Sequence, residues 1–130
     1  MSKSILVGKI INSTLSNNTD ITTYVGNKIF PLVALNGTTY PFITYSRTNV
    51  YIENGSKDGW IGDTVSFQIV VESNKYDESC EIAQLVRESF ENHTLSNDEL
   101  TIYNIHLTGI TEMFGNDDFI QTLDFECDSE

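Results

Sequence analysis

The side chains that most often carry out chemistry are few in this chain, and they are scattered. His93 and His106 are the only histidines, and either one, paired with a distant carboxylate, would make an acid/base pair. No GxSxG, GxxxxGK[ST], GxGxxG or HExxH pattern accompanies them. We therefore expect His93 at an exposed helix end and His106 on a strand face that points away from the core, with no catalytic or metal-binding role for either.

The thiols and carboxylates lead to the same expectation. Cys80 and Cys127 form no CxxC pair, which is typical of reduced, inert thiols in an intracellular chain. Cys80 lies near the start of an expected helix, where a thiolate is favoured, but no histidine is near it in sequence. Carboxylates at residues 116–118 and 127–130 offer oxygen ligands for a hard cation, without EF-hand spacing. The sequence predicts no enzyme, no cofactor and no metal site.

Charge is the strongest compositional signal. The 130 residues, of which 39% are hydrophobic, fit one domain over 1–130, and the net charge is −12. Residues 1–50 carry four Lys or Arg and one carboxylate, a net of +3, whereas residues 51–130 carry three and 18, a net of −15. We do not expect so acidic a domain to bind the phosphate backbone of DNA or RNA. Solubility explains the charge most simply, and a surface that lies near nucleic acid without binding it is the second explanation.

Hydrophobic periodicity predicts an α+β fold. We expect a mainly antiparallel sheet, with an N-terminal helix and a central helix packed on one face. Asn74 is expected as the N-cap of the central helix, Gly109 as a bulge, and residues 115–117 as a hairpin turn. No apolar run is long enough to span a membrane, and the first residues do not resemble a signal peptide. The expected helices cover residues 4–17, 20–25 and 76–92, and the expected strands cover 29–33, 41–52, 63–73, 100–107 and 119–126.

A glycine-rich loop at residues 53–62 separates two expected strands. It holds the only tryptophan, Trp60, next to Ile61. A monomer normally avoids exposing such apolar area, and tryptophan is enriched at interface hot spots. We expect Trp60 and Ile61, with Tyr51 and Lys57, to form an interface with another subunit or with a neighbouring protein. The alternative, that Trp60 folds back onto its own sheet, stays open.

Two segments carry a resemblance to a known family. They are VGNKIFP at residues 25–31 and YPFITY at residues 40–45, set between an N-terminal helix and the later strand, helix and hairpin. Their order and spacing resemble the tail completion proteins of long-tailed bacteriophages, also called tail terminator or tail-to-head joining proteins. The resemblance covers nearly the whole chain, and its motifs are structural, not chemical. The long loop at 53–62 departs from the family pattern.

The resemblance implies a structural role in the virion. Such a protein is a small subunit that forms a homo-oligomeric, typically hexameric, ring on the end of a finished tail tube. The ring ends polymerisation of the tube and offers a docking face to the head–tail connector protein. The implied partners are other copies of the chain, the tail tube protein, the connector, and DNA that passes through the lumen without specific binding. The implied location is the tail or neck, assembled in the cytoplasm of the bacterial host, with no membrane involved.

In this setting the acidic second half gains a purpose. A ring around moving DNA benefits from a lumen that repels phosphate, and we expect Glu53, Asp58, Asp117 and Asp118 on that channel surface. Two alternatives remain: another neck or minor capsid protein, and an acidic DNA mimic that inhibits a host enzyme. A mimic would be a monomer or dimer in solution. A small enzyme is a third class, which no group of residues favours.

Overall fold

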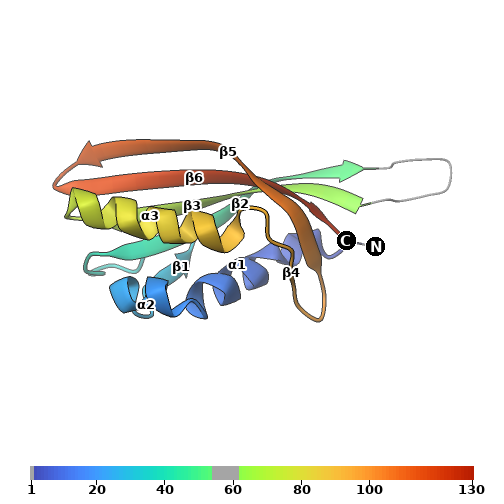
Figure 1. Ribbon diagram of the computed structural model, residues 1–130, viewed down its shortest axis with the longest axis horizontal. Helices are drawn as coiled ribbons and strands as arrows, with labels where there is room; N and C mark the ends of the chain where they lie inside the picture. Colours follow the sequence, from blue (N-terminus) through green and yellow to red (C-terminus); the bar gives the residue numbers. More distant parts are fainter. Residues whose placement is uncertain (1, 54–61) are drawn as a thin grey trace.

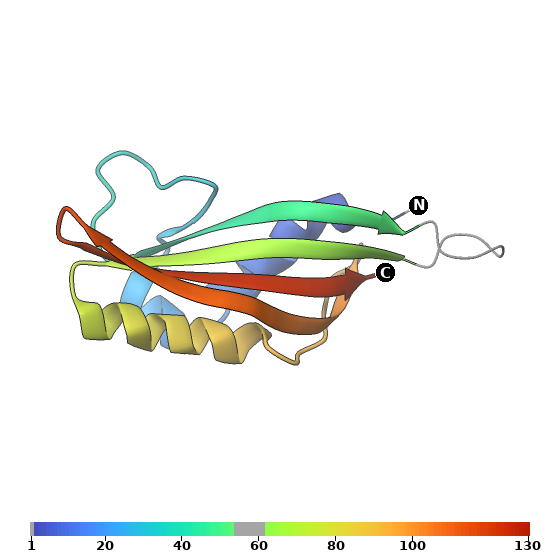
Figure 2. The same ribbon diagram turned by 90° about the horizontal axis from the view of Figure 1, so that it is seen from above.

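A six-stranded sheet with all the helices on one side forms the body of the protein (Figures 1 and 2). The computed structural model describes residues 2–53 and 62–130. The strand order is β1-β2-β3-β6-β5-β4, with β1 parallel to β2 and every other pair antiparallel. The predicted α+β fold is confirmed, and its sheet is mixed because of the β1–β2 pair. The elements are a 3₁₀ turn η1 (Ser4–Leu6), helices α1 (Val7–Ser16), α2 (Thr19–Val25) and α3 (Tyr76–Phe90), and strands β1 (Ile29–Pro31), β2 (Phe42–Glu53), β3 (Gly62–Ser73), β4 (Leu95–Ser96), β5 (Thr101–Gly115) and β6 (Asp118–Ser129).

The core lies between the sheet and the helices. Strand β3 buries every second residue from Val65 to Val71, as its alternating pattern predicts. Three aromatic rings meet at the centre: Phe67 stacks on Phe125 with centroids 5.1 Å apart, and Phe90 of α3 lies 5.7 Å and 5.6 Å from them. Because these rings come from β3, β6 and α3, they join the two central strands to the main helix.

Side-chain caps set where the helices begin. Asn18 caps α2, because its Oδ1 accepts hydrogen bonds from the amides of Asp20 and Ile21 at 3.0 and 3.1 Å. The predicted N-cap of α3, Asn74, is wrong. The chain stays extended through Lys75, and Oγ of Ser73 accepts a hydrogen bond from the Lys75 amide at 3.0 Å. A buried serine at the end of β3 thus organises this turn in place of Asn74.

Strand β5 is longer than predicted. We expected a strand over 100–107, whereas β5 continues to Gly115. The register with β6 shifts between Leu107 and Gly109, so the predicted bulge at Gly109 is confirmed. The irregularity bends the strand without ending it, and the turn that follows uses Asn116 and Asp117 at positive φ of 54° and 61°.

The two edges of the sheet are only partly paired, because the outermost strands, β1 and β4, are short. Strand β1 pairs with β2 only at residues 43–45, and β4 pairs with β5 only at residues 101–102. Beyond Ile102, within the part of the chain that the structure describes, β5 pairs on its β6 side and receives one further backbone hydrogen bond, from the amide of Asn92 to the Ile105 carbonyl at 2.9 Å. Such edges are available for contacts with other chains.

Candidate functional site

The sheet face opposite the helices is polar and carries a row of carboxylates. On β6 the odd-numbered residues from Gln121 to Ser129 are buried and the even-numbered ones are half-buried on the outer face. Asp124, Glu126 and Asp128, here called the acidic row, are therefore consecutive outward positions, roughly 7 Å apart along the strand. Since β6 is a central strand, the row runs along the middle of the sheet.

Neighbouring strands hold the acidic row in place. Nε2 of Gln68 on β3 donates to Oδ1 of Asp124 at 2.9 Å. Nδ2 of Asn104 on β5 donates to Oδ2 of Asp128 at 2.9 Å, and Nε2 of His106 lies 3.8 Å from Oε1 of Glu126. The partners are amides and one imidazole, and none of them is a Lys or Arg.

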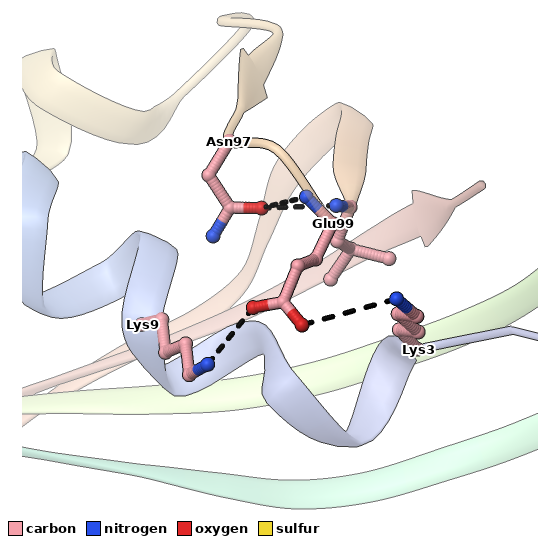
Figure 3. A network of polar contacts seen from close by, with 5 residues as sticks. Lys3, Lys9, Asn97 and Glu99 are labelled. Atoms are coloured by element: carbon pink, nitrogen blue, oxygen red, sulfur yellow. Dashed lines mark hydrogen bonds and ion pairs between the residues drawn. The ribbon is translucent and has the colours of Figure 1, made fainter.

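Few cations are available to neutralise that face. Arg47 is the only Lys or Arg in any of the six strands, and its Nη1 donates to the carbonyl of Ile5 at 2.8 Å on the helix side. The two lysines at the N-terminus are engaged elsewhere (Figure 3). Nζ of Lys9 in α1 donates to Oε1 of Glu99 at 2.8 Å, and Nζ of Lys3, just before η1, lies 3.9 Å from Oε2 of Glu99. The hydrogen bond from Lys9 is the main reason why the pKa of Glu99 lies below its ordinary value.

A pair of carboxyl groups lies at the end of the sheet near the β5–β6 turn. Glu72 at the end of β3 contacts Asp118 at the start of β6. Oδ1 of Asp118 is buried without a hydrogen-bond donor in the described part of the chain. Burial first, and then Asp118, raise the pKa of Glu72 from 4.5 to about 8. Burial therefore favours the protonated form of Glu72 beside Asp118.

The raised pKa of Glu72 makes stability depend on pH. The pKa of Glu72 is higher in the folded chain than in the unfolded one. Its contribution to the free energy of unfolding is therefore complete below about pH 4.5 and is lost as the pH rises towards 8. We expect Glu72→Gln to leave stability unchanged at pH 4.5 and to raise it at pH 9 by about 1–2 kcal/mol, or about 3–8 °C in Tm. Thermal unfolding followed by circular dichroism at both pH values measures this. Glu88→Gln, which removes the same charge from an exposed helix position, is the control and should show no such difference between the two pH values.

Exposed apolar side chains also gather at two other places. Leu32, Val33 and Leu35, here called the aliphatic loop, are 70–77% exposed between β1 and β2. The second place is the groove between α3 and β5, where Met113 and Phe114 are 67% and 60% exposed. A cavity of about 310 Å³ in this α3–β5 groove is lined by Tyr76, Glu112, Met113, Phe114, Phe119 and Gln121.

Nucleophiles and metal ligands do not converge in the described residues. Cys127 is buried, which raises the pKa of its thiol to about 12. Nε2 of His93 lies 2.9 Å from the Glu88 carbonyl at the end of α3. Over residues 2–53 and 62–130, no three His, Cys, Asp or Glu side chains are grouped as metal ligands, and no helix is long and apolar enough to cross a membrane.

Comparisons with known proteins match this architecture. The family "Tail completion protein gp17" matches residues 10–127. The chain belongs to this tail completion family. A solved structure described as "Virion of native gene transfer agent (GTA) particle" has the same fold, with a TM-score of 0.77 and 14% identity over 94% of this chain and 92% of that one. A second solved structure matches with a TM-score of 0.71 and 10% identity over 98% and 96%. No curated protein sequence matches the chain.

As a tail completion family member, the protein is a structural component of a phage tail. Its predicted site residues fall at separate places. Tyr51 is 53% exposed near the end of β2 and Glu53 is the last residue of that strand, whereas Asp117 and Asp118 lie at the β5–β6 turn. These are opposite ends of the sheet, roughly 35 Å apart by strand length. The structure therefore does not bring the predicted channel residues together. Four more predicted residues lie outside the described part: Lys57, Asp58, Trp60 and Ile61.

The acidic row is the functional candidate that the prediction missed. Its signal was present in the sequence, because Asp124, Glu126 and Asp128 alternate with Leu123, Phe125 and Cys127. Alternation shows that the three carboxylates share a face. That this face is the open one depends on where the helices pack.

Proposed function

We propose that the protein caps a finished phage tail tube, ends its polymerisation and presents the docking face for the head–tail connector. It does so as a closed, homo-oligomeric ring of six copies. The tail completion family supports this role, and the resemblance supplies the ring and its size. The partners are other copies of the chain, the tube protein and the connector.

The observation that carries the proposal furthest is the open sheet face. It has a row of three carboxylates on a central strand, with no Lys or Arg among the strand residues on that side. In the ring we place this face towards the lumen. Phosphates of passing DNA then meet like charge at each copy, so the duplex slides without being held. The acidic row takes the channel role that we expected of Glu53, Asp58, Asp117 and Asp118.

Deleting the gene tests the capping role. We expect tail tubes of variable and excessive length, with heads that stay unattached, in electron micrographs of lysates. A copy supplied in trans should restore tube length and joining. Immunogold against a tagged copy should label the head-proximal end of each tail. Tubes of normal length that still join heads, or label at another position, would contradict the proposal and favour another neck or capsid role.

A further inference from the structure

We propose that the aliphatic loop of one copy inserts into the α3–β5 groove of the next copy around the ring. This contact rests on the ring proposed above and names the two surfaces that would build it.

The aliphatic loop is an ordered projection of apolar side chains. Leu32, Val33 and Leu35 are 77%, 74% and 70% exposed. The amide of Leu32 donates to the Tyr45 carbonyl at 2.8 Å, and Nζ of Lys28 donates to the Thr39 carbonyl at 3.0 Å, so both ends of the loop are tied to the body. Leu32 has a φ of 66°, a conformation that is unfavourable for a leucine. Figure 2 shows the loop extending beyond the β2 side of the sheet.

The α3–β5 groove is a concave apolar surface on the other side of the sheet. Helix α3 packs on β3 and β6. On β5, residues 110–115 are exposed, whereas Ile102 and Ile105 are buried in the core. A cavity of about 310 Å³ lies near Phe114, and a second cavity of about 170 Å³ is lined in part by Ile110. Gln121 lines both cavities, so the two are neighbours. The groove thus runs along β5, whose edge away from β6 pairs with no strand of the described chain beyond Ile102.

The positions of the two surfaces favour a contact between copies. The loop joins β1 to β2, at one end of the strand order, and the groove borders β5, at the other. They lie at opposite edges of one sheet, so the loop of a copy cannot fill its own groove. A head-to-tail contact uses both surfaces once per copy and closes into a ring when the rotation permits.

Charge also complements across this contact. From Ile21 to Ile52 the chain has no carboxylate, and its ionised side chains are Lys28 and Arg47. The groove contains Glu112, and the first turn of α3 contains Asp77 and Glu78. Arg87, which lines the second cavity, is ion-paired with Glu91 at 3.1 Å. A second copy therefore offers the groove both apolar side chains and opposite charge, and long-range attraction of this kind favours the correct pairing.

Cysteine cross-linking tests the contact on assembled tails. Val33→Cys and Phe114→Cys are introduced singly and together in a Cys80→Ser chain, since Cys127 is buried. Both new cysteines replace exposed residues, so the fold should be retained. With a short bismaleimide, the double variant should give a ladder of cross-linked multimers on denaturing gels, and each single variant should stay monomeric.

A charge variant gives an independent measurement. Val33→Asp should reduce ring formation at least tenfold, measured by light scattering and by counting capped tubes. Asn36→Asp, which adds the same charge to the same loop but keeps all three aliphatic side chains, should reduce ring formation much less than Val33→Asp. Rings that form without the ladder, or single variants that cross-link to themselves, would overturn this contact and leave the ring intact. Absence of any ring would overturn the proposed function as well.

Discussion

Replacing Phe67 by alanine should lower the free energy of unfolding by about 3–5 kcal/mol. Phe67 is fully buried and stacks on Phe125 with an interplanar angle of 12°, while Phe90 packs against both rings. These three side chains join β3, β6 and α3, so no single element can move to fill the space that the substitution leaves. The loss therefore includes the transfer free energy of the ring and the cost of a residual cavity.

Urea unfolding of the purified chain measures the effect. Ser66→Ala is the matched control, since Ser66 is one residue away on the same strand but on the outer face, and it should change stability by less than about 0.5 kcal/mol. A loss below about 1.5 kcal/mol for Phe67→Ala would show that the core repacks around the gap, contrary to the close packing inferred for this layer.

Reversing the charge of the acidic row should have the largest effect on function. In the triple variant Asp124→Lys, Glu126→Lys and Asp128→Lys, each copy presents three cations to the lumen where the native chain presents three anions. Cations that contact phosphates hold DNA through counterion release. We expect DNA ejection per joined particle to fall at least tenfold at low salt and to recover partly as salt is raised, because salt screens these contacts.

The measurement is DNA release in vitro from particles that carry heads, which separates transport from assembly. The control triple variant Asp20→Lys, Glu88→Lys and Asp98→Lys makes the same change in net charge at exposed positions away from the open sheet face. Unchanged ejection in the acidic-row variant, at any salt concentration, would show that this face does not line the channel. A similar loss in the control would attribute the effect to net charge alone.

Local patterns in the sequence were sufficient to predict most of the elements. The two-residue period of β3 and the apolar spacing of α1 and α3 predicted which side chains are buried, because burial on one face imposes those periods. The prediction failed where local signals compete. The strand at 100–107 was ended too early, because β6 supplies a partner for β5 on both sides of the bulge at Gly109. Asn74 has the residue type of an N-cap, but Ser73 lies where the backbone turns.

The candidate site was harder to predict, because its residues share no segment. The segments VGNKIFP and YPFITY resemble the tail completion family, and the match over residues 10–127 confirmed that the chain belongs to it. Neither motif could indicate that Glu72 meets Asp118, since that contact depends on the pairing of β3 with β6. Nor could either motif indicate that the aliphatic loop and the α3–β5 groove lie at opposite edges of one sheet.

The sequence by itself determined the element types, the buried face of each element and the excess of negative charge in the second half of the chain. Those properties follow from side-chain chemistry and from the local repeat of helix and strand. Only the tertiary structure decided the strand order, and with it which sheet face stays open and which edges stay unpaired. Strand order depends on contacts between residues far apart in the chain, so alternation alone cannot show whether the acidic row faces a helix or solvent.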